Sequence, residues 1–182
     1  MDLTEKKIKE ISRYSGIRTD IRVDSVALPN GSISRREVVE RPDAVAILPL
    51  DENGDVYCVR QYRYAFSAEV LELPAGKLEP GEEPLPAAAR ELSEETGITA
   101  GRIEPLGSIM MSPGFCTEVL HLYLARELHF GSAHPDEDEL LHVEKYSLHT
   151  LADMVMRGEI TDAKSAVAIL KTERFLEEER RK

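Results

Sequence analysis

Apolar and polar residues alternate in several short stretches of this chain, and such alternation is typical of half-buried β-strands. One stretch at 21–28 leads into the Pro-Asn-Gly segment 29–31, a hairpin turn signal, and residues 32–40 follow as the expected partner strand. A few strands of this length cannot build a core of their own. We therefore predict that residues 1–40 form a small β-rich lobe that packs on the main domain or on a second subunit.

From residue 44 onward the apolar pattern alternates between the period of a strand and that of a helix, which indicates a mixed α and β domain. Strands are predicted at residues 44–50, 56–64, 69–73, 103–110, 117–124 and 141–146. The first two flank Asn53-Gly54, a second hairpin signal. Helices are predicted to close the chain at residues 148–157 and 162–179.

A further helix is predicted between the third and fourth of these strands. Pro84 and Pro86 suit its first turn, where a missing N–H is tolerated, and Gly97 is well placed to cap its C-terminus. The alanine-rich sequence in between favours a helix. We expect one stripe of it to face the core, formed by Leu85, Ala88, Ala89, Leu92 and Thr96.

The composition narrows the class of protein. The chain has 182 residues, of which 42% are hydrophobic, enough for one domain with a substantial core. Its net charge of −11 argues against a nucleic-acid-binding surface. No apolar stretch is long enough to span a membrane and no signal segment opens the chain, so we expect a cytoplasmic protein. Cys58 and Cys116 lack CxxC spacing and are expected to be reduced thiols.

Three glutamates on the helix after Pro84 are candidate metal ligands. Glu91 and Glu95 are four residues apart and share a helix face, and Glu94 lies beside them. Like charges at this spacing destabilise an isolated helix, and a bound divalent cation reverses that effect. Carboxylate oxygens are the hard ligands that Mg²⁺ or Mn²⁺ prefers. The alternative is an acidic helix face in solvent, which is common when such a cluster stands alone.

The cluster does not stand alone. Residues 76–98 fit Gly-x5-Glu-x7-Arg-Glu-U-x-Glu-Glu-x-Gly-U at every specified position, where U is a bulky aliphatic residue. This segment resembles the box of the Nudix hydrolases, which cleave a nucleoside diphosphate linked to another group. The resemblance implies an α/β fold, an α/β/α sandwich around a mixed sheet, for residues 41–182, with the β-rich lobe in residues 1–40.

The resemblance also assigns roles within this segment. It implies that the Ala75 carbonyl and the carboxylates of Glu91, Glu94 and Glu95 bind the metal. Arg90 is expected to orient these glutamates by charge-assisted hydrogen bonds, and Glu82 to support the loop or the ligands.

A second acidic cluster, at residues 136–139, precedes the last strand. On its own it is as compatible with a solvated loop as with catalysis. In the ADP-ribose pyrophosphatase branch of the Nudix family, a loop at this place supplies the glutamate that activates water. The resemblance therefore assigns the general base to Glu137, with Glu139 as the second candidate, and the sequence does not separate them.

Residues outside the box point to the substrate. Similar enzymes use an arginine at the place of Arg63 for a substrate phosphate, and Arg36 is a candidate to reach substrate from the lobe, across a dimer. Pro113 lies 16 residues beyond Gly97, and with Gly114 it resembles the loop that marks the ADP-ribose branch.

The resemblance thus implies a Mg²⁺-dependent hydrolase that converts ADP-ribose to AMP and ribose 5-phosphate. The nearest alternative is the same reaction on another nucleoside diphosphate sugar, such as GDP-mannose. A more distant one is a sensor that binds ADP-ribose without cleaving it, for which a degraded box is expected. RNA decapping fits poorly with the net charge of −11. The resemblance also implies a homodimer with exchanged lobes.

Overall fold

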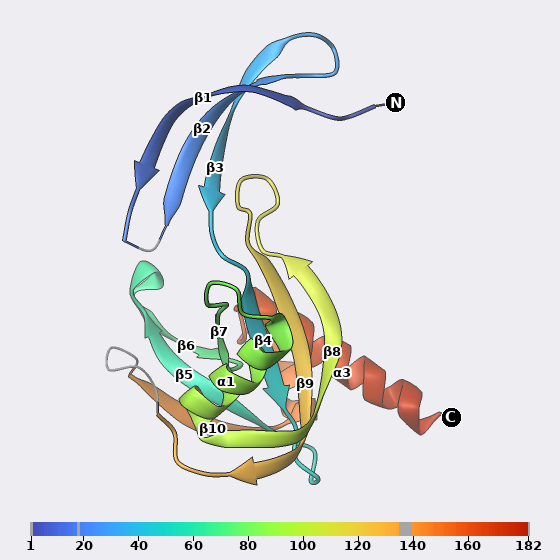
Figure 1. Ribbon diagram of the computed structural model, residues 1–182. Helices are drawn as coiled ribbons and strands as arrows, with labels where there is room; N and C mark the ends of the chain where they lie inside the picture. The colour runs from blue at the N-terminus through green and yellow to red at the C-terminus, as the bar shows by residue number, and fades with distance from the viewer. Residues whose placement is uncertain (1, 18, 135–139, 182) are drawn as a thin grey trace. The chain divides into compact units, whose positions relative to one another are not determined.

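The computed structural model (Figure 1) describes residues 2–17, 19–134 and 140–181. The chain divides into two units. The first contains Met1–Asp43 and Met110–Val119, and the second contains Ala44–Ile109 and Leu120–Lys182. The first unit is therefore larger than the lobe expected from the sequence, because a distant segment, residues 110–119, joins it.

An antiparallel sheet of three strands forms most of the first unit. The strands are β1 (Lys6–Ser15), β2 (Asp20–Ala27) and β3 (Ile33–Glu40), in the order β1-β2-β3. The Leu28 N–H donates to the Ser32 carbonyl at 2.8 Å, and Gly31 has a φ of 86°, so the hairpin expected at residues 29–31 is confirmed.

Strand β1 has no counterpart among the predicted strands, and its bulges explain why. Its apolar residues Ile8, Ile11 and Tyr14 are three apart, which does not match the period of two in a regular strand. The register with β2 shifts between Lys7 and Lys9, and again near Ile11. Each β-bulge adds one residue to β1, so the strand forms without the alternation that would reveal it.

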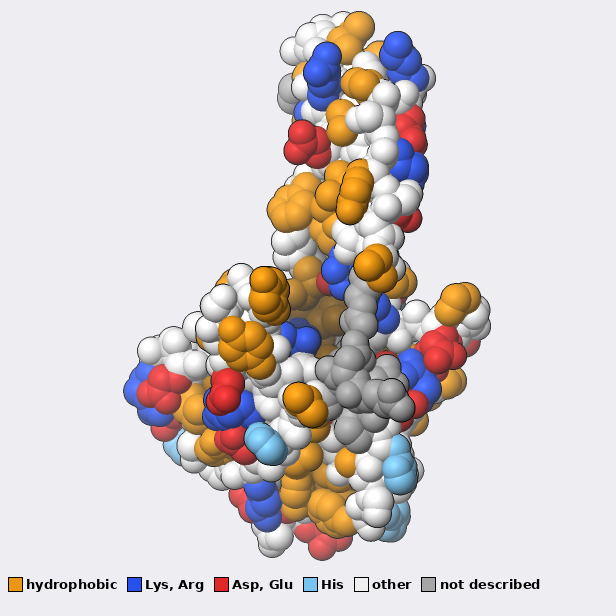
Figure 2. All heavy atoms as spheres, turned by 90° about the vertical axis from the view of Figure 1, so that its left-hand side faces the viewer, with side chains coloured by type: hydrophobic (Ala, Val, Ile, Leu, Met, Phe, Trp, Pro, Cys, Tyr) orange, Lys and Arg blue, Asp and Glu red, His pale blue; other side chains and the backbone are white. Residues whose placement is uncertain are grey.

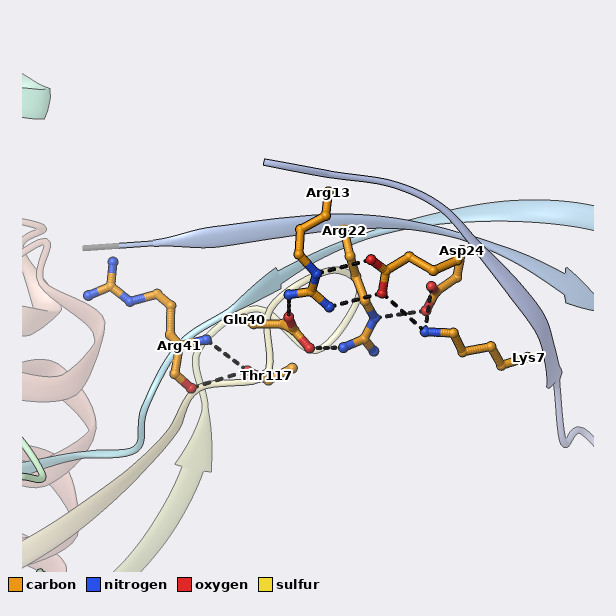
Figure 3. A network of polar contacts seen from close by, with 8 residues as sticks. Lys7, Arg13, Arg22, Asp24, Glu40, Arg41 and Thr117 are labelled. Atoms are coloured by element: carbon orange, nitrogen blue, oxygen red, sulfur yellow. Dashed lines mark hydrogen bonds and ion pairs between the residues drawn. The ribbon is translucent and has the colours of Figure 1, made fainter. Parts of the chain in front are cut away.

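A network of charged side chains runs across this sheet (Figure 3). Three cations contact three carboxylates, and each carboxylate contacts two cations: Lys7, Arg13 and Arg22 with Glu10, Asp24 and Glu40. At the end of β3, the Arg41 N–H donates to the Thr117 hydroxyl at 3.0 Å, which ties the sheet to residues 110–119.

Two sheets form the framework of the second unit. One has the order β7-β4-β9-β8 and the other β10-β5-β6. Strands β4 and β9 are parallel, whereas β4 and β7 are antiparallel, so the larger sheet is mixed. The strands are β4 (Ala44–Pro49), β5 (Asp55–Arg63), β6 (Ala68–Glu72), β7 (Ala75–Lys77), β8 (Ile98–Met110), β9 (Val119–Phe130) and β10 (Leu141–Ser147).

The turn at Asn53-Gly54 forms, and the Asp51 N–H donates to the Asp55 carbonyl at 2.9 Å, but the strands on either side separate soon after it. Gly54 has a φ of 83° and its N–H donates to the Asp51 carbonyl at 3.1 Å. Beyond one bridge between Leu50 and Val56, β4 joins one sheet and β5 the other. The second turn signal is therefore confirmed, but the hairpin ends after this bridge, because β4 pairs with β7 and β9, and β5 with β6 and β10.

Helices cover both faces of the larger sheet, which gives the expected α/β/α sandwich (Figure 1). They are α1 (Pro84–Thr96) on one face and α3 (Ala163–Arg180) on the other, with α2 (Leu148–Met156) beside α3. The core under α1 consists of Val45, Ile47, Ala87, Ala88, Leu92, Ile98, Tyr123 and Ala125. No helix in the described part of the chain has both the length and the apolar character to cross a membrane.

The buried face of α1 differs from the expected one. Leu85 is 48% exposed and Ala89 is also exposed, so these two expectations were wrong. Ala87 is buried in their place. The helix is rotated so that Glu91 and Glu95 also point inward, which the apolar pattern alone does not favour.

Candidate metal and substrate site

Helix α1 carries two buried glutamates on the side that faces β7. Pro84 starts the helix, and Gly97 ends it in the left-handed conformation with a φ of 70°. Glu91 is 9% exposed and Glu95 is 4% exposed. Burying two carboxylates one turn apart is costly unless cations or hydrogen bonds compensate them.

Strand β7 passes directly against these carboxylates. A Cβ atom at Gly76 would lie 2.0 Å from the carboxyl carbon of Glu91, so any larger residue there would displace that carboxylate from its present position. The Ala75 N–H donates to Glu95 Oε2 at 3.1 Å. Pairing of Ala46 with Ala75 fixes β7 against β4, and with it the position of this backbone.

Arg90 is shared among three glutamates. It makes two parallel bonds to Glu82, with Nε and Nη2 each 2.9 Å from an oxygen, and its Nη1 lies 2.8 Å from both Glu91 Oε1 and Glu94 Oε2. Nη2 also donates to the Lys77 carbonyl at 3.1 Å. Arg90 thus joins the loop before α1 to the helix and holds two of the candidate metal ligands.

Glu82 shows the effect of this arginine on a carboxylate. Hydrogen bonds from Arg90, together with one from the Glu79 N–H, lower the pKa of Glu82 to about 2. Its folded-state pKa is therefore below the unfolded value, so its contribution to stability is present above about pH 4.5 and is lost as the pH falls toward 2.

The oxygen donors at this place fit a hard divalent cation. Glu91 and Glu95 are buried beside the backbone of residues 75–76, whereas the side chain of Glu94 is 43% exposed. Among the residues that the structure describes, no three acidic, histidine or cysteine side chains already form a metal-ligand group. Mg²⁺ commonly binds one or two carboxylates and completes its shell with water and substrate phosphate, so a partial set is sufficient.

The segment after β9 is attached to the C-terminal end of α1. The Gly131 N–H donates to the Gly97 carbonyl at 2.7 Å, and the His134 N–H donates to the Glu94 carbonyl at 2.8 Å. A Cβ atom at Gly97 would come within 2.6 Å of the Ala133 nitrogen, so this close approach also requires glycine. The two candidate bases, Glu137 and Glu139, lie outside the described residues.

Arg63 belongs to a second charged group. Its Nε and Nη2 donate to the two oxygens of Glu72 at 2.6 and 2.7 Å, and Lys164 from α3 binds the same carboxylate. Burial raises the pKa of Glu72, but the hydrogen bonds from Arg63 and the charge of Lys164 outweigh it and leave the pKa below its usual value. Glu72 therefore stays ionised although it is 3% exposed.

The remaining candidate substrate residues lie in the first unit. Arg36 donates to Glu5 through Nε, at 2.8 Å, and through Nη2, and its Nη1 contacts the Ser34 hydroxyl. Pro113 and Gly114 are exposed in a turn that is closed by bonds to the Ser112 carbonyl. The structure thus brings the candidate metal ligands together with Arg90 in one unit, namely Ala75, Glu91, Glu94 and Glu95. Arg63 lies near Glu95.

Sequence reasoning missed Glu72 and Lys164. The signal available for Glu72 was its place directly before the apolar Leu73-Pro74. A carboxylate at the end of a buried strand needs a partner. Lys164 gave no such signal, since it reads as an ordinary helix-surface lysine and lies 92 residues away from Glu72.

Comparisons with known proteins find a family, relatives and a solved structure that resemble this chain. The NUDIX domain family matches residues 40–168. A Bacillus subtilis protein named ADP-ribose pyrophosphatase is 42% identical over 92% of this chain and 91% of its own length. A Bacillus methanolicus protein named methanol dehydrogenase activator is 40% identical over 91% of this chain and 90% of its own. A solved structure described as an ADP compounds hydrolase superposes with a TM-score of 0.88, at 22% identity, over 98% of both chains.

Proposed function

The chain belongs to the Nudix hydrolase family, and on this premise we propose that it hydrolyses the diphosphate of ADP-ribose to AMP and ribose 5-phosphate. The observation that carries the proposal is the buried pair Glu91 and Glu95 against the glycine backbone of β7. Relatives named ADP-ribose pyrophosphatase, at 42% and 38% identity, support the choice of substrate.

The metal ligands proposed are the carboxylates of Glu91, Glu94 and Glu95 and the carbonyl of Ala75. Membership of the family implies a divalent cation, and the oxygen donors favour Mg²⁺, with Mn²⁺ as an alternative. When bound, such an ion neutralises charge on the diphosphate. Arg90 is proposed to hold Glu91 and Glu94 in orientation, in line with its 2.8 Å contacts to both.

The general base is proposed to be Glu137, with Glu139 as the second candidate. The chain enters this acidic segment from His134, which is bonded to the end of α1. This bond supports the proposal, because it holds the last described residue before the acidic segment beside the box helix. Glu137 or Glu139 would take the proton from the attacking water as that water bonds to phosphorus and the P–O bond of the diphosphate bridge breaks.

The substrate contacts proposed are Arg63 for a phosphate, and Arg36, Pro113 and Gly114 from the first unit. Arg63 is the best supported, because a guanidinium held on one edge by Glu72 still offers its other edge to a phosphate. The net charge of −11 disfavours nucleic acid as a substrate. It does not disfavour a small anionic substrate, because a bound cation would neutralise charge at the site.

GDP-mannose is the specific alternative. A Citrobacter koseri protein named GDP-mannose pyrophosphatase is 32% identical over 77% of this chain. The higher identity and coverage of the ADP-ribose relatives favour ADP-ribose. A non-catalytic sensor is less favoured, because the box is complete at each specified position.

A homodimer through the first unit is also proposed. Its sheet exposes large apolar side chains, including Ile8 at 51%, Tyr14 at 67% and Ile33 at 71%. Figure 2 shows apolar side chains at the surface of this unit between charged ones. Covering them with a second copy would remove apolar surface from water. A sedimentation mass near the monomer's 20.4 kDa at micromolar concentration would exclude the dimer.

The test of the function is product analysis on a substrate panel. ADP-ribose, GDP-mannose and related compounds are incubated with the protein and Mg²⁺, and products are separated by chromatography. We expect AMP and ribose 5-phosphate from ADP-ribose as the fastest reaction, and none in the presence of chelator. Fastest cleavage of GDP-mannose would overturn the substrate assignment, and no cleavage of any compound would leave only the sensor.

The same assay assigns the base. We expect Glu137→Gln to lower turnover by two or more orders of magnitude, the range expected for loss of a general base, with Glu139→Gln as the matched control. A larger loss in Glu139→Gln would transfer the role to that residue.

A further inference from the structure

The first turn of helix α3 carries a buried lysine, Lys164, that contacts Glu72. Lys164 is 8% exposed, its Nζ binds Glu72, and it lies 3.0 Å from Oδ2 of Asp162, the residue that caps α3. Burying a lysine is costly, and Nζ compensates by contacting two carboxylates.

Glu72 connects this lysine to Arg63. The carboxylate accepts two parallel bonds from Nε and Nη2 of Arg63, at 2.6 and 2.7 Å, while Oε2 also accepts from Lys164. A guanidinium has a second edge, formed by Nη1 and Nη2, that can donate two bonds to a phosphate while the first edge stays on a carboxylate. The Arg63 side chain is 41% exposed, so it is accessible from solvent.

Lys164 also balances the charge of the residues that it joins, which are Arg63, Glu72 and Asp162. Arg63 and Glu72 alone would form a neutral pair, and Asp162 adds a negative charge. Lys164 restores neutrality to the four residues. Without Lys164 these residues would carry one net negative charge beside the proposed diphosphate site, and Glu72 would be held from one side only.

The same turn of α3 also holds the backbone that leads to the box. The Leu73 N–H donates to the hydroxyl of Ser165 at 2.7 Å. Two residues later, the Ala75 N–H donates to Glu95. The segment between Glu72 and Ala75 is therefore fixed by α3 at one end and by α1 at the other.

We propose that Lys164 is a positioning residue for substrate binding, which holds and neutralises Glu72 so that Arg63 keeps its outer edge available for a substrate phosphate. The inference rests on the proposed function for the identity of that substrate. It adds a residue from α3, outside the box and its loops, to those that determine substrate affinity.

The kinetic test compares Lys164→Met with Lys171→Met, an exposed lysine on the same helix. Loss of one charge-assisted hydrogen bond corresponds to roughly a tenfold change in a dissociation constant. We expect Lys164→Met to raise KM for ADP-ribose about tenfold with kcat changed less than about threefold, and Lys171→Met to change neither. Arg63→Lys should also raise KM, and the double variant should be no worse than Arg63→Lys alone, because both changes remove the same contact.

A readout without turnover separates this inference from the proposed function. The Nε–Hε resonance of Arg63, identified by its loss in Arg63→Lys, is recorded by ¹⁵N-correlated NMR. We expect it to shift or broaden in Lys164→Met but not in Lys171→Met. If the wild type releases no AMP, the proposed function fails, and this resonance still tests the link between Lys164 and Arg63.

Two results would overturn the inference. One is an Arg63 resonance that is identical in Lys164→Met and the wild type. The other is a pair of KM effects that multiply in the double variant, which would mean that the two residues act independently. Should Lys164→Met fail to fold, Lys164→Gln, which retains a donor but not the charge, is measured in the same way with the same expectations.

Discussion

The contacts of Arg90 on α1 and the charge network of the first unit both join cations to carboxylates, but in different proportions. At the box, one arginine is shared among three carboxylates, those of Glu82, Glu91 and Glu94. Across the β1–β3 sheet, three cations meet three carboxylates, and each carboxylate contacts two cations. In the sheet network cations and carboxylates are equal in number, whereas at the box one arginine contacts three carboxylates.

We interpret this difference as that between a structural network and the proposed metal site. A balanced network gains little from an added ion and holds a sheet in register. Carboxylates concentrated on a buried helix face are costly without a further cation, and that cost is recovered when a metal binds. A Cβ atom at Gly76 would overlap with the carboxyl group of Glu91. The β7 backbone therefore leaves room for this carboxylate.

Removing one box carboxylate should give the largest effect. Glu95→Gln keeps an oxygen that can accept from the Ala75 N–H but loses the charge. We expect an intact fold, by circular dichroism and thermal melting, and AMP release reduced by about 10³-fold or more, because a proposed metal ligand is lost. Near-normal turnover would contradict the metal assignment.

Filling the space at Gly76 should be nearly as damaging. Gly76→Ala places a Cβ atom 2.0 Å from the Glu91 carboxyl carbon in the present geometry, so that carboxylate must move. We expect turnover to fall about 100-fold, as for misplaced catalytic groups, and stability to fall by about 1–3 kcal/mol.

The double variant Gly76→Ala/Glu91→Ala is the matched control for that steric argument. Removal of the clashing carboxylate should restore much of the stability, measured by urea unfolding, without restoring turnover. If the double variant is no more stable than Gly76→Ala, the loss does not arise from this contact.

Metal addition tests the charge balance directly. Mg²⁺ at 100 times its Kd stabilises the folded state by about 2.7 kcal/mol, which raises Tm by roughly 5 °C or more for a chain of this size. We expect this increase in the wild type and in Glu40→Gln, and its loss in Glu91→Gln/Glu95→Gln. An equal increase in all three proteins would mean that Mg²⁺ binds elsewhere.

The smallest effect is expected in the first unit. Glu40→Gln weakens contacts to Arg13 and Arg22 in a partly exposed network. Surface ion pairs contribute at most about 1 kcal/mol, so we expect a loss no larger than that, further reduced by salt, and unchanged AMP release. A loss of several kcal/mol would show that this network is more than a surface feature.

Several features were predictable because they depend on neighbours in sequence. The helix α1, its capping by Gly97, the hairpin turn at residues 29–31 and the shared face of Glu91 and Glu95 follow from turn chemistry and helical spacing. Membership of the Nudix family follows from the same local spacing.

Other features were decided only by contacts between distant segments. The β-bulges of β1 break its apolar period, and the strands around Asn53-Gly54 join different sheets. The pairing of Glu72 with Lys164 joins residues that are 92 positions apart. A residue's type states what it can bind, but which distant partner reaches it depends on how the sheets and helices pack, since burial and pairing energies are collective properties of the folded chain.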